Sequence, residues 1–115
     1  MTPEAFEKAA LALPAATLSV QWGDDRVYKV GGKMFAVTDG AGARLSMKMT
    51  EIAYAALIET GRSHRAAYMP VSAAWVAFDD LAVLDAREVE DWLATAHQLV
   101  AAKLTRKLRA ELGLS

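Results

Sequence analysis

The hydrophobic and polar positions along this chain change period several times, and each change marks a boundary between predicted elements. A period of two predicts a strand with one buried face and one wet face, because successive side chains point to opposite faces. The clearest example is residues 44–49, in which Leu45, Met47 and Met49 alternate with polar residues. Further strands are expected at residues 18–22, 66–69 and 75–79.

Two adjacent glycines predict a tight hairpin. Gly31-Gly32 separates two β-prone runs, residues 26–30 and 33–37. Both central positions of a primed hairpin turn need positive φ, which glycine adopts without steric cost. This hairpin opens the most basic part of the chain.

Three segments repeat apolar residues at helical spacing. Each begins at a residue whose side-chain oxygen can cap the first turn: Thr2, Thr50 and Asp85. Pro14 and Gly61 end the first two helices. Thr105 offers a new N-cap, so we expect the long third helix to break there, before a short helix at residues 106–112.

One-sided alternation is typical of an antiparallel sheet covered by helices on a single face. At 115 residues and 54% hydrophobic content, we expect a single α+β domain over residues 1–115. The absence of cysteine excludes disulfides, thiolate metal sites and cysteine nucleophiles. We see no signal peptide and no apolar run near the roughly 20 residues that span a bilayer, so we expect a cytoplasmic protein without membrane contact.

The net charge of −1 conceals strong segregation along the sequence. Residues 1–25 and 49–102 are acidic, whereas residues 26–48 and 103–115 are basic. The bases of the two basic segments are Arg26, Lys29, Lys33, Arg44, Lys48, Lys103, Arg106, Lys107 and Arg109. They serve either to bind an anionic partner, or as a solvated sheet face with favourable charges at helix C-termini.

Few residues offer catalytic or metal-binding chemistry. The two histidines, His64 and His97, have no carboxylate at a metal-ligand spacing, and we expect His97 to be a half-buried structural residue. No serine stands in a nucleophile elbow, and Gly31-Gly32-Lys33 lacks the spacing of a phosphate loop. We expect Asp24-Asp25 and Asp79-Asp80 to bond nearby backbone N–H groups in turns. These observations favour neither an enzyme nor a bound cofactor.

Aromatic residues accompany the bases on the predicted strands. If the helices cover one face, the other can present Arg44 and Lys48 with Lys29 or Lys33. Such a flat face suits phosphates and stacked bases. The candidate aromatics are Trp22, Tyr28, Tyr68 and Trp75, most of which we expect to pack in the core instead.

Several segments occur in the order, and nearly the spacing, of one known family. They are Leu13-Pro14, Trp22-Gly23-Asp24, Tyr28-Lys29-Val30-Gly31-Gly32-Lys33-Met34-Phe35-Ala36, Leu45-Ser46-Met47-Lys48, Trp75-Val76 and Leu99-Val100-Ala101-Ala102-Lys103-Leu104. Over residues 3–112 the chain thereby resembles the MmcQ/YjbR-like family of small bacterial proteins. This resemblance implies a CyaY-like (frataxin-like) fold, and DNA binding through a double wing of β-hairpins.

Carried over to this chain, the family's binding positions fall on the basic segments. They are Lys29, Lys33, Arg44 and Lys48, with Trp75 on a neighbouring strand. The charge pattern adds Lys103, Arg106 and Lys107 of the basic tail as candidate contacts. Thr105 stands where the family often has proline, which is harmless because threonine also caps helices. Ser72-Ala73-Ala74 stands where a lysine is common, and this predicts weaker DNA affinity.

We therefore expect a monomeric, non-enzymatic DNA-binding protein with weak and salt-dependent affinity. The alternative is a protein-interaction or small-ligand module. In its metal-binding version, the ligands would be the acids of the first helix or the Asp79-Asp80 turn.

Overall fold

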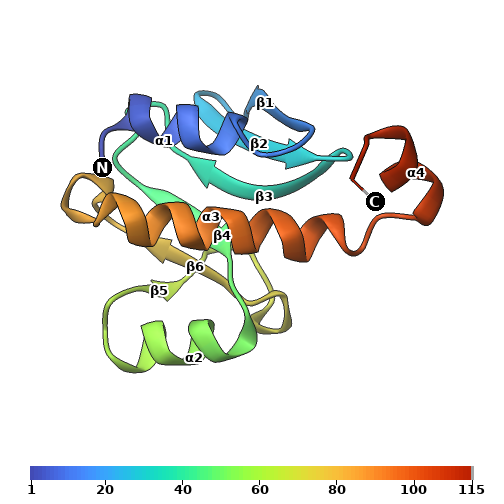
Figure 1. Cartoon of the computed structure of the whole chain (residues 1–115). Coiled ribbons are helices and arrows are strands. Elements are labelled where there is room, and N and C mark those ends of the chain that lie inside the picture. The colour runs from blue at the N-terminus through green and yellow to red at the C-terminus, as the bar shows by residue number, and fades with distance from the viewer. Residues whose placement is uncertain (115) are drawn as a thin grey trace.

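Six strands pair in the order β1-β2-β3-β4-β6-β5, and every neighbouring pair is antiparallel (Figure 1). This computed structural model describes residues 1–114. The strands are β1 (Ala16–Gln21), β2 (Asp25–Val30), β3 (Lys33–Thr38), β4 (Leu45–Lys48), β5 (His64–Arg65) and β6 (Trp75–Phe78). The predicted α+β class with an antiparallel sheet is confirmed.

Every α-helix begins after a residue whose side chain accepts a hydrogen bond from a first-turn N–H. The helices are α1 (Pro3–Leu11), α2 (Glu51–Glu59), α3 (Ala86–Ala101) and α4 (Arg106–Glu111), and the short 3₁₀ turns are η1 (Val71–Ala73) and η2 (Leu81–Val83). The capping residues are Thr2, Thr50, Asp85 and Thr105. Each cap satisfies an N–H that the helix itself leaves unpaired. The expected break between the last two helices is therefore confirmed.

The core lies between the sheet and the helices, and α3 runs across the sheet in Figure 1. Its largest fully buried side chains come from α1, four of the strands, η2 and α3 and include Phe6, Tyr28, Phe35, Leu45, Met47, Val76, Leu81 and Leu93. Leu57 of α2 belongs to the same cluster. All three long helices thus cover the same face of the sheet, and the opposite face stays open.

A β-bulge in β3 decides which side chains reach the core. The register pairs Tyr28 with Ala36 but Lys29 with Met34, so Phe35 is the extra residue. Phe35 and Ala36 both enter the core, whereas Met34 lies on the open face. A bulge re-aims side chains in this way by interrupting the strict alternation of a strand.

His97 has the structural role that the sequence predicts. Its side chain is buried on α3, and Nε2 donates a hydrogen bond of 2.7 Å to the carbonyl oxygen of Pro14. The imidazole also packs edge to face on Phe35, with 5.5 Å between ring centroids. These contacts tie α3 to the turn between α1 and β1.

Two predicted strands differ from the observed ones. The strand expected at residues 66–69 is wrong: pairing covers only β5, and the chain turns at Tyr68, where φ is +66°. The strand expected at residues 18–22 is shifted, because it ends before Trp22, where φ is +51°. A left-handed residue cannot continue a strand. Among residues 1–114, no helix is long and apolar enough to cross a membrane.

Candidate functional site

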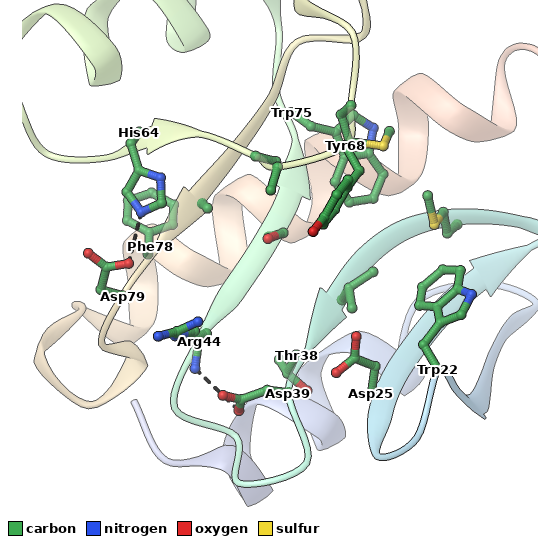
Figure 2. A pocket seen from close by; sticks show the side chains of 17 residues that line it. Trp22, Asp25, Thr38, Asp39, Arg44, His64, Tyr68, Trp75, Phe78 and Asp79 are labelled. Atoms are coloured by element: carbon green, nitrogen blue, oxygen red, sulfur yellow. Dashed lines mark hydrogen bonds and ion pairs between the residues drawn. The ribbon is translucent and has the colours of Figure 1, made fainter.

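A groove of about 760 Å³ lies on the open face of the sheet (Figure 2). Its floor is built from strand side chains that alternate with those of the core: Met34, Val37, Ser46, Trp75 and Ala77. We call it the open-face groove. Its volume falls within the range of about 300–1,000 Å³ that is typical of small-molecule sites.

Two exposed aromatic residues form walls of the open-face groove. Trp22 follows β1 and is 66% exposed, and Tyr68 follows β5 and is fully exposed. Figure 2 shows them on different sides of the groove, with Tyr68 beside Trp75. Both have a left-handed backbone, which costs a residue with a Cβ roughly 1–2 kcal/mol. Backbone strain of this kind concentrates at functional sites, and here both strained residues line the groove.

Trp75 differs from these walls because it is buried. Only 4% of its surface is exposed, and its ring lies in the floor of the open-face groove. The residue before it, Ala74, also has positive φ. The expectation that tryptophan packs inside is thus met by Trp75 but not by Trp22.

The end of the groove near the β3–β4 turn carries most of its charge. The register aligns Thr38, Leu45 and Phe78 across three strands. The charged groups that line the groove next to these residues are Asp25, Asp39, Arg44, His64 and Asp79, and we call this region the carboxylate end. Carboxylates outnumber the one arginine there.

His64 and Asp79 form an ion pair across neighbouring strands. Their Nε2 and Oδ1 atoms lie 2.8 Å apart, and the dashed line in Figure 2 marks this contact. The hydrogen bond that His64 donates to Asp79 raises the pKa of His64 above 6.5 and lowers the pKa of Asp79 below 3.8. Arg44 lies close enough to oppose the first effect and reinforce the second.

The opposite end of the sheet is basic. Lys29 and Lys33 flank the β2–β3 turn, and Lys48 ends β4. The tip of this hairpin points toward α4 in Figure 1, and Gly31 lies against Leu104 at the end of α3. The bases gathered at this end are Lys29, Lys33, Lys48, Lys103, Arg106 and Lys107, and we call them the hairpin-end basic surface.

Lys48 is the most constrained of these bases. Its Nζ donates a hydrogen bond of 2.7 Å to the carbonyl oxygen of Ala73. Burial lowers the pKa of Lys48 below 10.5, and the nearby charge of Lys103 lowers it further. This interaction shows that positive charge from β4 and from the end of α3 converges.

The structure therefore divides the predicted site residues between two places. Arg44 and Trp75 line the open-face groove, with Arg44 at its carboxylate end. The other predicted residues lie at the hairpin end of the sheet: Lys29, Lys33, Lys48, Lys103, Arg106 and Lys107. Arg44 directly precedes β4 and Lys48 ends it, so these two bases lie at opposite ends of that strand.

Of the paired aspartates, Asp80 bonds a nearby backbone N–H, whereas Asp79 pairs with His64 instead. Asp80 Oδ1 accepts a hydrogen bond from the backbone of Ala82, and Asp39 Oδ1 accepts from Ala43 and Arg44. No group of three or more histidine or acidic side chains among residues 1–114 is placed to hold a metal ion. The predicted bond to the backbone of the turn is therefore confirmed for Asp80 and wrong for Asp79.

The sequence named Trp22 and Tyr68 as candidate aromatics but did not predict that they leave the strands to form the walls of a groove. Trp22 stood at the end of a predicted strand, and Tyr68 stood inside one. A usable signal for Trp22 is its position before Gly23-Asp24, which is turn chemistry. Tyr68 has no comparable signal apart from Pro70 two residues later.

The fold is an α+β domain with helices on one face of an antiparallel sheet. Residues 11–99 match the family model YjbR, and the chain belongs to the YjbR family. Curated proteins give no match to this chain.

A solved structure has the same fold. It is the crystal structure of Deinococcus radiodurans protein DR2400, which contains the domain DUF419. The sequences are 23% identical, and the alignment covers 99% of this chain and 92% of that one with a TM-score of 0.84. At this identity the similarity establishes the architecture and leaves the function to be argued from the residues.

Proposed function

We propose that this chain is a DNA-binding protein, and not an enzyme, that contacts phosphates through the hairpin-end basic surface. One observation carries the proposal: along residues 1–114, the bases of this surface have no carboxylate within ion-pair distance. Arg26 and Arg62, which lie elsewhere, are instead paired with Glu7 and Glu88. Unpaired bases that converge favour an anionic partner over internal stabilisation.

The chemistry of the surface suits a polyanion. Lysine and arginine side chains that replace condensed counterions gain affinity without reading the sequence of the bases. The charge of Lys103 contributes to the lowered pKa of Lys48, after burial, so these two bases repel each other. A phosphate placed between Lys48 and Lys103 would relieve their mutual repulsion. The contact therefore stabilises both partners.

The proposal does not depend on base stacking by Trp75. That residue pairs across the sheet with Lys48, but its ring is buried in the floor of the open-face groove and so is not free to stack on a base. Arg44 also stands apart, beside Asp39 and Asp79. We therefore propose binding without base preference, by a hairpin that meets the backbone of the duplex.

The test is a titration of a fluorescein-labelled DNA duplex followed by anisotropy at several salt concentrations. About five phosphate contacts give a salt slope of about −4.5, and so roughly a 500-fold loss of affinity between about 50 and about 200 mM salt. Lys33→Gln and Lys103→Gln should each weaken binding and reduce the slope by about 0.9.

Arg87→Gln is the matched control. Arg87 is exposed and stands in the first turn of α3, about 20 Å along the helix from its hairpin end. Its loss should leave the affinity and the slope unchanged. Binding weaker than about 10⁻⁴ M at low salt would contradict the proposal. Equal effects of Arg87→Gln and Lys33→Gln would also contradict it, because they would show that only net charge matters.

A further inference from the structure

The open-face groove has no part in the proposed DNA contact. Neither Lys29 nor Lys48 lines it, although its floor residues Met34 and Trp75 pair with these two lysines across the strands. Its floor is largely apolar, with Met34, Val37 and Trp75 facing the space. A concave apolar site with a few convergent polar groups is the usual form of a small-molecule site.

The aromatic walls are held in place at a cost. Trp22 is 66% exposed and Tyr68 fully exposed, and both adopt a left-handed backbone that favours glycine. Neither ring is needed by the core, because neither belongs to the buried cluster or its partly buried neighbours. A role that explains both the exposure and the strain is to stack against a flat ligand.

The charged residues that line the groove indicate which charge the ligand carries. Asp39 is engaged by backbone N–H groups of its own turn, and Asp79 is engaged by His64. Asp25 has no hydrogen-bond or ion-pair partner within residues 1–114, and Figure 2 shows it near Trp22. A free carboxylate beside an aromatic wall attracts a cation from two directions.

We propose that the open-face groove binds a small flat aromatic cation, with its ring against Trp22 and Tyr68 and its positive charge toward Asp25. A quaternary or protonated amine on an aromatic body has this chemistry. Asp79 is already paired with His64, so it is the carboxylates of Asp25 and Asp39 that disfavour an anionic head group.

The decisive experiment compares three ligands with the same naphthalene ring. They are naphthylmethyl-trimethylammonium, its uncharged tert-butyl isostere and naphthylacetate. Each is titrated into the full chain at low salt, and the amide and tryptophan indole shifts are followed by NMR. We expect the cation to bind about tenfold more tightly than the neutral compound and the anion to bind most weakly, with shifts centred on Trp22, Asp25 and Trp75.

Variants separate the ring contacts from the charge contact. Asp25→Asn should bring the cation down to the affinity of the neutral compound and leave the neutral compound unchanged. Asp24→Asn, an exposed neighbour that does not line the groove, is the matched control and should change neither. Trp22→Ala and Tyr68→Ala should weaken all three ligands, and since both side chains are exposed these variants should fold.

Four outcomes overturn the proposal. The first is that none of the three compounds binds, and the second is that the cation and the neutral compound bind with equal affinity. The third is that the anion binds most tightly, and the fourth is that the chemical-shift changes centre on the hairpin end. Because DNA is absent from this assay, none of them bears on the proposed DNA contact.

Discussion

Gly31 lies directly against Leu104. A Cβ built on Gly31 would fall 2.6 Å from Cδ1 and 2.8 Å from Cδ2 of that leucine. Leu104 is buried, so its side chain has little room to yield. This contact joins the glycine hairpin to the end of α3, and it is how two distant family-typical segments of the sequence meet in space.

Gly31→Ala should therefore destabilise the protein strongly. The φ of +60° costs roughly 1–2 kcal/mol for a residue with a Cβ, and the steric clash adds roughly 1–3 kcal/mol. We expect a loss of about 3 kcal/mol in the free energy of unfolding, measured by urea denaturation. Gly32→Ala is the matched control: its φ is +80°, but no atom lies within 4 Å, so it should cost only about 1 kcal/mol.

Repeating Gly31→Ala in a Leu104→Ala variant isolates the effect of the contact between Gly31 and Leu104. In Leu104→Ala the methyl groups that would clash are gone, so Gly31→Ala should cost no more than Gly32→Ala. An unchanged cost of Gly31→Ala in that background would show that the backbone, and not Leu104, sets the penalty.

Because the backbone at Tyr68 is left-handed, we expect glycine to be more stable than alanine at this position, which reverses the order found in helices. Tyr68→Gly removes the strain and Tyr68→Ala keeps it, so the glycine variant should be more stable by about 1 kcal/mol. At Ala94, an exposed helical position, glycine should instead be less stable than alanine by about 1 kcal/mol. Thermal and urea unfolding of the three variants beside the parent chain measure both differences. Greater stability of Tyr68→Ala than Tyr68→Gly would refute the strain.

The His64–Asp79 pair should be visible by titration. Asp79 raises the pKa of His64, so the imidazole proton shifts in NMR should report a value above 6.5. Asp79→Asn should lower that pKa, and Arg44→Ala should raise it, because the charge of Arg44 opposes protonation. Since the folded-state pKa of His64 is raised, the pair's contribution to stability is present below pH 6.5. It is lost as the pH rises through the folded-state value.

Lys48 should deprotonate at a lower pH than other lysines, because burial and Lys103 lower its pKa. Lys103→Gln should raise this pKa in part, while the effect of burial remains. Direct titration of the ¹³Cε signals by NMR measures both. The folded chain holds this proton less tightly than the unfolded chain, so the penalty is present at neutral pH and fades as the pH rises toward 10.5. A pKa of 10.5 or above for Lys48 would contradict the effect of burial.

Local chemistry made much of the fold predictable. Thr2, Thr50, Asp85 and Thr105 cap helices through their own side chains, and this interaction needs only a few neighbouring residues. The Gly31-Gly32 turn was predictable for the same reason. The strand alternation of Leu45 and Met47 also correctly identified the covered face.

Features that depend on distant contacts were not predictable. The bulge at Phe35 exists because both Phe35 and Ala36 fit the core, and alternation alone cannot show this. The left-handed turns at Trp22 and Tyr68 oppose the strand propensity of aromatic residues. The separation of Arg44 from the lysines follows from strand register, which a list of charges does not contain.

The antiparallel register gives the molecule an electric dipole that runs along its strands, from the carboxylates beside Asp39 to the lysines beside the hairpin tip. The electric field of a polyanion exerts a torque on such a dipole and orients the molecule before contact. This torque acts at distances where the attraction between any single pair of charges is negligible. The hairpin would approach first, and the mouth of the open-face groove near Asp25 would face away into solvent. The two proposed ligands would then be able to occupy the same molecule at once.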